Sequence, residues 1–224
     1  MTPSSAGTIV KRVGDVRIAA GSVMLSGELQ LPDEATGIVL FAHGSGSSRF
    51  SPRNQYVARV IKRAGVGTLL FDLLTRDEEA IDTQTRQLRF DIGLLARRLV
   101  DVTNWLAWAD ETRQLRPGYF GSSTGGGAAL VAAAALGKKV GAVVSRGGRP
   151  DLAGDALPLV KAPTLLIVGG LDYQVTEMNR EAVDQLRCEK KLEIVPGATH
   201  LFEEPGTLDE VARLAAAWFV KHLK

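Results

Sequence analysis

The sequence is poor in cysteine and in aromatic residues. Cys188 is the single cysteine among 224 residues, which excludes an internal disulfide and a cysteine-rich metal site. Aromatic residues make up 6% of the chain, whereas 24 residues are glycine. This balance favours tight turns between strands and helices, and helices that pack closely.

The sequence also lacks an excess of one charge and a long apolar run. Lys and Arg number 27 against 25 Asp and Glu, so charge gives no reason to expect a nucleic-acid partner. No apolar run approaches the roughly 18 residues that a membrane helix needs. Residues 1–7 lack the basic start and apolar core of a secretory signal. The sequence therefore predicts a cytoplasmic protein with no membrane and no nucleic-acid partner.

Short apolar runs predict a mostly parallel sheet. Residues 16–19 and 23–31 alternate apolar and polar side chains, which predicts an antiparallel hairpin with one solvated face. Six later runs are apolar throughout, as expected of strands buried on both faces. They lie at residues 37–42, 67–72, 119–121, 140–145, 164–168 and 192–195.

Helical periodicity separates several of these runs. Apolar residues recur at helical spacing from Phe90 to Ala109, and a last helix is predicted to begin at Thr207 with a capping-box pattern. Alternating strands and helices predict an α/β fold in one domain, residues 1–224. Residues 1–14 are expected to form a flexible N-terminus. The polar segment 75–89 is expected to be a mobile cap loop near the carboxyl ends of the strands, or a solvated loop without a role.

Three candidate catalytic residues each follow a buried run. Ser123 lies in Gly121-Ser122-Ser123-Thr124-Gly125, which matches the G-x-S-x-G pattern of a nucleophile on a sharp strand-to-helix turn. Asp172 follows the run at 164–168, and His200 follows the run at 192–195. Because ligands bind at the carboxyl ends of strands in α/β sheets, the three residues are expected to meet at one edge. They predict a serine nucleophile, a histidine base and an aspartate that orients it.

The chain resembles the α/β-hydrolases, and within them it is similar to the dienelactone-hydrolase-like group of small esterases. The resemblance runs from about Val16 to the C-terminus and rests on the three motifs above and on His43-Gly44-Ser45-Gly46. It implies an α/β-hydrolase fold: a mostly parallel sheet with an antiparallel N-terminal hairpin, helices on both faces and no large lid domain.

The same resemblance implies an oxyanion hole built from the backbone N–H groups of Ser45 and Thr124, with no metal and no cofactor. Dienelactone hydrolase itself is known for a cysteine nucleophile, whereas this position is Ser123 here. That difference favours ordinary ester hydrolysis. With only segment 75–89 as a cover, the pocket is expected to be shallow and to take small soluble esters.

Substrate contacts and the reaction itself leave alternatives open. Arg146 and Arg149 follow the run at 140–145 and are candidates for binding a substrate carboxylate, or else they pair with nearby acidic residues. Tyr173, beside Asp172, either lines the pocket or packs. The same triad serves a thioesterase, a lactonase or a peptidase, and a binding protein without turnover is a further reading. A nucleotide-binding protein is disfavoured because residues 121–127 lack the required glycine spacing and the P-loop lysine.

Overall fold

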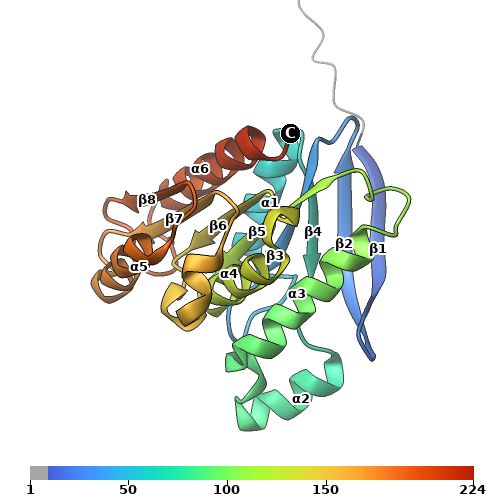
Figure 1. Ribbon diagram of the computed structural model, residues 1–224, viewed down its shortest axis with the longest axis horizontal. Coiled ribbons are helices and arrows are strands. Elements are labelled where there is room, and N and C mark those ends of the chain that lie inside the picture. The colour runs from blue at the N-terminus through green and yellow to red at the C-terminus, as the bar shows by residue number, and fades with distance from the viewer. Residues whose placement is uncertain (1–9) are drawn as a thin grey trace, which may run out of the picture.

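A twisted sheet of eight strands forms the centre of the molecule (Figure 1). The computed structural model describes residues 10–224. The strands are β1 (Val10–Ala20), β2 (Val23–Pro32), β3 (Gly37–Ala42), β4 (Gly67–Phe71), β5 (Arg116–Ser122), β6 (Ala142–Arg146), β7 (Thr164–Gly169) and β8 (Lys190–Val195). The predicted hairpin and the six predicted runs are therefore confirmed as strands, but β8, at the edge of the sheet, is largely exposed or half-buried and not buried on both faces as predicted.

The sheet is mixed in the way the sequence predicts. Its order is β1-β2-β4-β3-β5-β6-β7-β8, with β1 and β4 antiparallel to β2 and every other neighbouring pair parallel. One expectation changes at the N-terminus. Residues 10–14, expected to be flexible, belong to β1 because their backbone pairs with the end of β2. The rest of that expected segment, residues 1–9, lies outside the described residues.

Helices cover both faces of the sheet (Figure 1). They are α1 (Pro52–Arg63), α2 (Arg76–Thr85), α3 (Ile92–Leu106), α4 (Thr124–Leu136), α5 (Tyr173–Gln185) and α6 (Thr207–His222), with shorter 3₁₀ segments at Leu88–Phe90, Gly137–Lys139 and Pro150–Leu159. Helices α1 and α6 pack on one face, and α3, α4 and α5 pack on the other. Each face has its own apolar core, which is why β3 to β7 are apolar on both sides.

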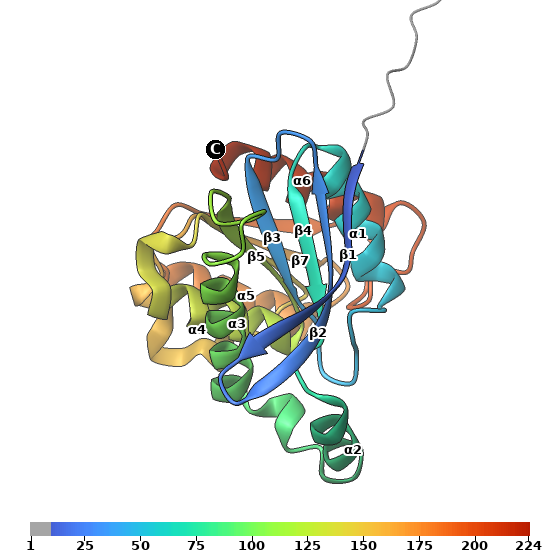
Figure 2. The ribbon, with the colours of Figure 1, turned by 90° about the vertical axis from the view of Figure 1, so that its right-hand side faces the viewer.

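The segment expected to be a cap loop, residues 75–89, is instead largely the helix α2. Thr75 accepts a hydrogen bond from the Glu78 amide, and the Glu78 carboxylate accepts one from the Thr75 amide, so the two residues form a capping box. Asp82 is the one buried residue of this helix. Apolar periodicity could not reveal α2, because it stands at the end of the molecule and not against a core (Figure 2).

Helix α6 begins at Thr207 as predicted, but without the predicted capping box. Gly206, not Thr207, is the N-cap residue, and the Thr207 hydroxyl donates to the carbonyl of Glu204. Thr207 therefore stabilises the preceding turn, and the capping-box pattern that begins there forms no capping box.

The strand order changes direction at β3. The chain leaves β3 through α1 on one face and returns in β4, and later enters β5 on the other side of β3 and leaves through α4 on the opposite face. The carboxyl ends of β3 and β5 therefore flank a switch point, the place where open α/β sheets bind ligands.

Helix α4 lies against the carboxyl ends of β3 and β5 because three glycines, Gly125 to Gly127, follow Thr124 in its first turn. A Cβ on Gly125 would lie 2.2 Å from the carbonyl oxygen of Ala42, and one on Gly121 would lie 2.5 Å from the carbonyl oxygen of Gly125. Backbone atoms cannot move aside as a flexible side chain can. The glycines are therefore required for the position of α4.

We expect Gly125→Ala to lower the free energy of unfolding by about 1–3 kcal/mol, as other over-packing substitutions do. The added methyl group must push α4 away from β3. Urea denaturation of wild type and variant measures the difference.

Gly93→Ala is the matched control, because Gly93 also lies in the first turn of a long helix, α3. Its new Cβ would meet only the ends of two side chains, Arg97 Nη1 at 3.3 Å and Asp91 Oδ1 at 3.4 Å. Helix propensity favours alanine there by up to about 1 kcal/mol. Equal losses in both variants would contradict the assignment of a special role to Gly125.

Candidate active site

Ser123 lies on the sharp turn between β5 and α4 that the G-x-S-x-G pattern predicts. Its φ of 51° and ψ of −123° lie outside the conformations that L-residues favour. Hydrogen bonds hold this backbone: its amide donates to the carbonyl of Arg146, and its carbonyl accepts from the amides of Gly126 and Arg149. The strained serine is thus supported from both α4 and the chain that follows β6.

Asp172 and His200 are in direct contact. The Nδ1 atom of His200 lies 2.6 Å from Oδ2 of Asp172. The loops that carry these residues follow the neighbouring strands β7 and β8. The loops can approach closely because Gly169 has no side chain: a Cβ there would lie 2.4 Å from the carbonyl oxygen of Ala198. With Nδ1–H donating to the carboxylate, Nε2 of His200 is the free acceptor.

The histidine ring and Ser123 both adjoin the end of β6. A Cβ on Gly147 would lie 3.5 Å from Cε1 and Nδ1 of His200, while the preceding residue, Arg146, holds the Ser123 amide. The three predicted triad residues are therefore gathered at one edge of the sheet.

The loop between β3 and α1 runs directly beside Ser123. A Cβ on Gly44 would lie 3.1 Å from the Cβ of Ser123. Within the described residues, the amides of Ser45 and Thr124 donate to no protein acceptor. Both amides are therefore available to a ligand, as the predicted oxyanion hole requires.

His43 anchors the start of this loop, a role that sequence reasoning missed. Its Nε2 accepts a hydrogen bond of 3.1 Å from the amide of Leu73, so Nδ1, 3.0 Å from the carbonyl oxygen of Gly44, is the donor. Both ring nitrogens of the neutral imidazole are therefore hydrogen-bonded. Burial lowers the pKa of His43 below its ordinary value, against the opposing effects of the Gly44 carbonyl and of Asp72 and Glu79.

Asp72 anchors the other end of the loop. Its carboxylate accepts a hydrogen bond of 2.9 Å from the Arg49 amide and pairs with the Arg49 guanidinium. The position of Asp72 immediately after a buried strand was the sequence signal for this contact. The loops after β3 and β4 are thus tied together at two points.

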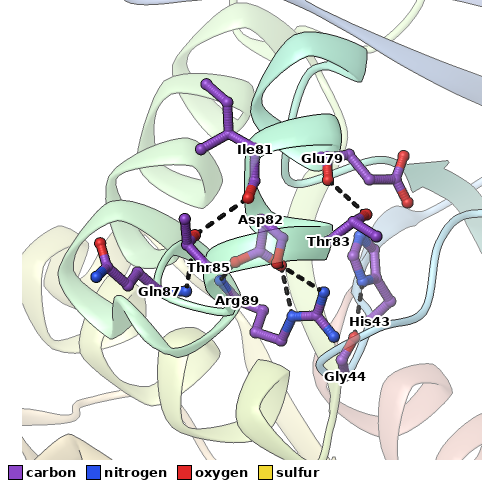
Figure 3. A network of polar contacts seen from close by, with 9 residues as sticks. All are labelled: His43, Gly44, Glu79, Ile81, Asp82, Thr83, Thr85, Gln87 and Arg89. Atoms are coloured by element: carbon purple, nitrogen blue, oxygen red, sulfur yellow. Dashed lines mark hydrogen bonds and ion pairs between the residues drawn. The ribbon is translucent and has the colours of Figure 1, made fainter.

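A cavity of about 180 Å³ opens between the β3–α1 loop and the cap helix α2. Its walls come from the β3–α1 loop, from the end of β4, from α2 and from Thr124. Figure 3 shows Glu79, Thr83 and Arg89 on the side of the cap that faces His43 and Gly44, whereas Ile81 and Thr85 lie on the far side.

One ion pair braces the cap internally, and a second, from Arg98 of α3 to Glu78 of α2 at 2.6 Å, attaches it to the rest of the molecule. The Arg89 guanidinium pairs with the buried Asp82 carboxylate through Nε, at 2.5 Å, and the Arg89 amide donates to the same carboxylate (Figure 3). Burial alone would raise the pKa of Asp82, but the hydrogen bonds and charge of Arg89 hold it below its ordinary value. The charge of Asp82 is therefore compensated inside the cap.

The three predicted substrate contacts have different surroundings, and none of them lines this cavity. Arg149 makes two hydrogen bonds to Asp151, at 2.8 and 2.7 Å, which is the pairing that the sequence left as the alternative. Tyr173 begins α5 and is 72% exposed. Arg146 is buried and pairs with no described residue, and this burial, with the charge of Arg53, lowers its pKa to about 10.

Residues 10–224 contain neither a candidate metal site nor a candidate membrane helix. No group of three or more His, Cys, Asp or Glu side chains in this part of the chain could hold a metal ion. No helix in it is long and apolar enough to cross a membrane.

The strand order, with helices on both faces and a switch of direction at β3, is that of the α/β-hydrolases, and the chain has this fold. It belongs to the dienelactone hydrolase family, whose family model matches residues 25–221. The family resemblance inferred from the motifs is thereby confirmed.

Solved structures support the same placement. The crystal structure of dienelactone hydrolase from Anabaena variabilis ATCC 29413 is 63% identical, with a TM-score of 0.93 over 94% of this chain and 97% of that chain. Est1E from Butyrivibrio proteoclasticus is 17% identical, with a TM-score of 0.77 over 93% of this chain and 98% of that chain. At that identity, the second similarity shows the fold alone.

Two curated proteins from Mycobacterium tuberculosis, strains CDC 1551 and H37Rv, are each 59% identical over 209 residues, or 93% of this chain. Both carry the name "Putative phosphoribosyl transferase". The matched region is 46% of the length of each protein, so the chain spans about half the length of the curated relatives it matches.

The buried His43 predicts a specific pH dependence of stability. Its pKa in the folded chain lies below the ordinary 6.5, so the unfolded chain takes up a proton first as the pH falls. The contribution of His43 is therefore complete above about pH 6.5 and declines below it. We expect His43→Gln to cost about 1–3 kcal/mol at pH 8 and to reduce the loss of stability between pH 6.5 and 5.

Urea denaturation at a series of pH values measures this slope. Val57→Ala, a buried change on α1 that removes no titrating group, is the control for destabilisation alone and should keep the slope of the wild type. If His43→Gln also keeps the wild-type slope of stability against pH, His43 does not become protonated on unfolding.

Proposed function

We propose that the chain is a serine hydrolase that cleaves small carboxylic esters through an acyl-enzyme on Ser123. The observation that carries this proposal is the 2.6 Å contact between His200 and Asp172, at the sheet edge where Ser123 occupies its strained turn. Hydrolase chemistry itself is the property of the family to which the chain belongs.

The reaction follows from these positions. The Oγ of Ser123 attacks the ester carbonyl while Nε2 of His200 takes its proton, and the same nitrogen then protonates the departing alkoxide. Asp172 orients the imidazole and stabilises its protonated form. The amides of Ser45 and Thr124 hold the oxyanion, and one such donor is typically worth about 3–4 kcal/mol of barrier. Water then releases the acid by the reverse sequence of proton transfers.

Lactones are a second candidate class of substrate. The reason is the 63% identity to a protein named dienelactone hydrolase, since a lactone is a cyclic ester and is opened by the same acyl transfer. Phosphoribosyl transfer is not proposed, because the relatives that carry this name are about twice as long as the part that matches here.

Arg146 is the one predicted substrate contact that we retain, as a proposed attraction for an anionic group. Its guanidinium has no acidic partner within residues 10–224 and lies near Arg53. Its backbone carbonyl accepts a hydrogen bond from the Ser123 amide, and the side chain does not line the cavity, so the anionic group that it would attract lies outside that cavity.

We expect Ser123→Ala to abolish covalent labelling by a fluorophosphonate probe. We also expect its turnover of p-nitrophenyl acetate to fall at least about 10³-fold, because nucleophile and base act as a unit. Asp172→Asn should retain part of the labelling but lose turnover by a similar factor, because the histidine tautomer changes.

Ser122→Ala is the matched control, since the neighbouring Ser122 ends β5 and is buried. It should keep both labelling and turnover. Persistent labelling of Ser123→Ala would refute the proposed nucleophile.

A further inference from the structure

The cavity beside the candidate oxyanion hole belongs to the acyl side of an ester. The leaving oxygen must lie near Nε2 of His200, because that atom protonates it. The cavity is lined by Ser45 and Thr124, the proposed oxyanion donors, and by neither Ser123 nor His200. A group held there is therefore the substituent on the carbonyl carbon that remains attached to the enzyme.

The cavity is small. Its volume of about 180 Å³ lies below the roughly 300–1,000 Å³ of most small-molecule sites, which favours a short acyl group.

Polar groups make up about half of the cavity walls, and several of them have no protein partner. The hydroxyls of Ser45 and Ser47 make no hydrogen bond within residues 10–224, and both line the cavity. The Glu79 carboxylate also forms no hydrogen bond or ion pair there. The lining contains no Phe, Tyr or Trp, and its apolar side chains are Leu73, Leu74 and Leu95. Ser45 and Glu79 are exposed to solvent, so a hydrocarbon acyl group would displace water from them without replacing its hydrogen bonds.

The charge of the walls disfavours a second carboxylate. Asp72 is paired with Arg49, and Asp82 is paired with Arg89, so these four residues are neutral as pairs. Glu79 adds one uncompensated negative charge. Hydrogen-bond donors on an uncharged acyl group suit this lining, whereas an anionic acyl group is repelled.

We propose that the chain prefers esters of short, uncharged hydroxy acids over esters of alkanoic acids of the same length. This preference rests on the proposed function, because it names the acyl group that the same site transfers. The hydroxyl of the acyl group donates to the Thr83 hydroxyl, which can accept while it donates to the Glu79 carbonyl, and to Glu79 or the serine hydroxyls of the β3–α1 loop.

The test compares three p-nitrophenyl esters of four-carbon acids: butyrate, 3-hydroxybutyrate and hemisuccinate. We expect kcat/KM for the hydroxybutyrate to exceed that for the butyrate about three- to tenfold after correction for spontaneous hydrolysis, as one or two net hydrogen bonds give. Hemisuccinate should be the slowest of the three.

Variants of α2 connect this preference to the cavity. Glu79→Gln removes the charge but keeps an acceptor, so hemisuccinate should gain several-fold relative to butyrate while the preference for hydroxybutyrate remains. Thr83→Val removes a hydroxyl from the cavity wall and should reduce that preference.

Thr85→Val is the matched control on the same helix. Thr83 and Thr85 each donate to the carbonyl four residues earlier, but Thr85 lies on the far side of α2 (Figure 3). Its variant should keep the wild-type ratio of hydroxybutyrate to butyrate.

The outcomes separate the two proposals. If Ser123 is labelled and butyrate is hydrolysed, but the ratio of hydroxybutyrate to butyrate is one or less, the inferred preference is wrong and the serine hydrolase stands. If Thr83→Val and Thr85→Val change the ratio equally, the preference does not arise in this cavity. If no ester is hydrolysed and Ser123 is not labelled, both proposals fail.

Discussion

The contact between the first turn of α4 and the carboxyl ends of β3 and β5 is the constraint on which the site depends. Gly121 and Gly125 allow this contact, because any Cβ there would overlap backbone atoms. Its consequence is the conformation of Ser123, whose φ of 51° is maintained by hydrogen bonds from two segments. The strain of one residue is thus offset by packing spread over a helix and two strands. The available amide of Thr124 follows from the same turn.

The second half of the site is built from loops that hold one another. His43 and Asp72 connect the loops after β3 and β4, Asp82 and Arg89 brace the cap internally, and Glu78 of the cap helix pairs with Arg98 of α3. Because these polar groups are buried or half-buried, their hydrogen bonds and charges must be satisfied internally. The network therefore does two things. It fixes the loop that presents the Ser45 amide, and it leaves a small cavity whose remaining free groups are hydroxyls and one carboxylate.

The relatives of this chain share its family but differ in length. The chain matches nearly the full length of the dienelactone hydrolase from Anabaena variabilis, but about half the length of the Mycobacterium tuberculosis proteins. The same hydrolase unit therefore occurs in chains of different length. Since fold does not determine function, the substrate has to be inferred from the cavity of this chain and not from the names of its relatives.

The sequence by itself determined the strands, the α/β class and the positions of Ser123, Asp172 and His200, because apolar runs and glycine-flanked turns are local signals. Helix α2 was missed because its stability comes from a capping box and from ion pairs, which leave no apolar period. The capping-box pattern at Thr207 predicted a side-chain cap that does not form, because the N-cap residue is Gly206. Tertiary structure alone decided that Arg149 binds Asp151, that His43 anchors the loop and which polar groups face the cavity. These contacts join residues whose relation depends on how strands and loops meet in space.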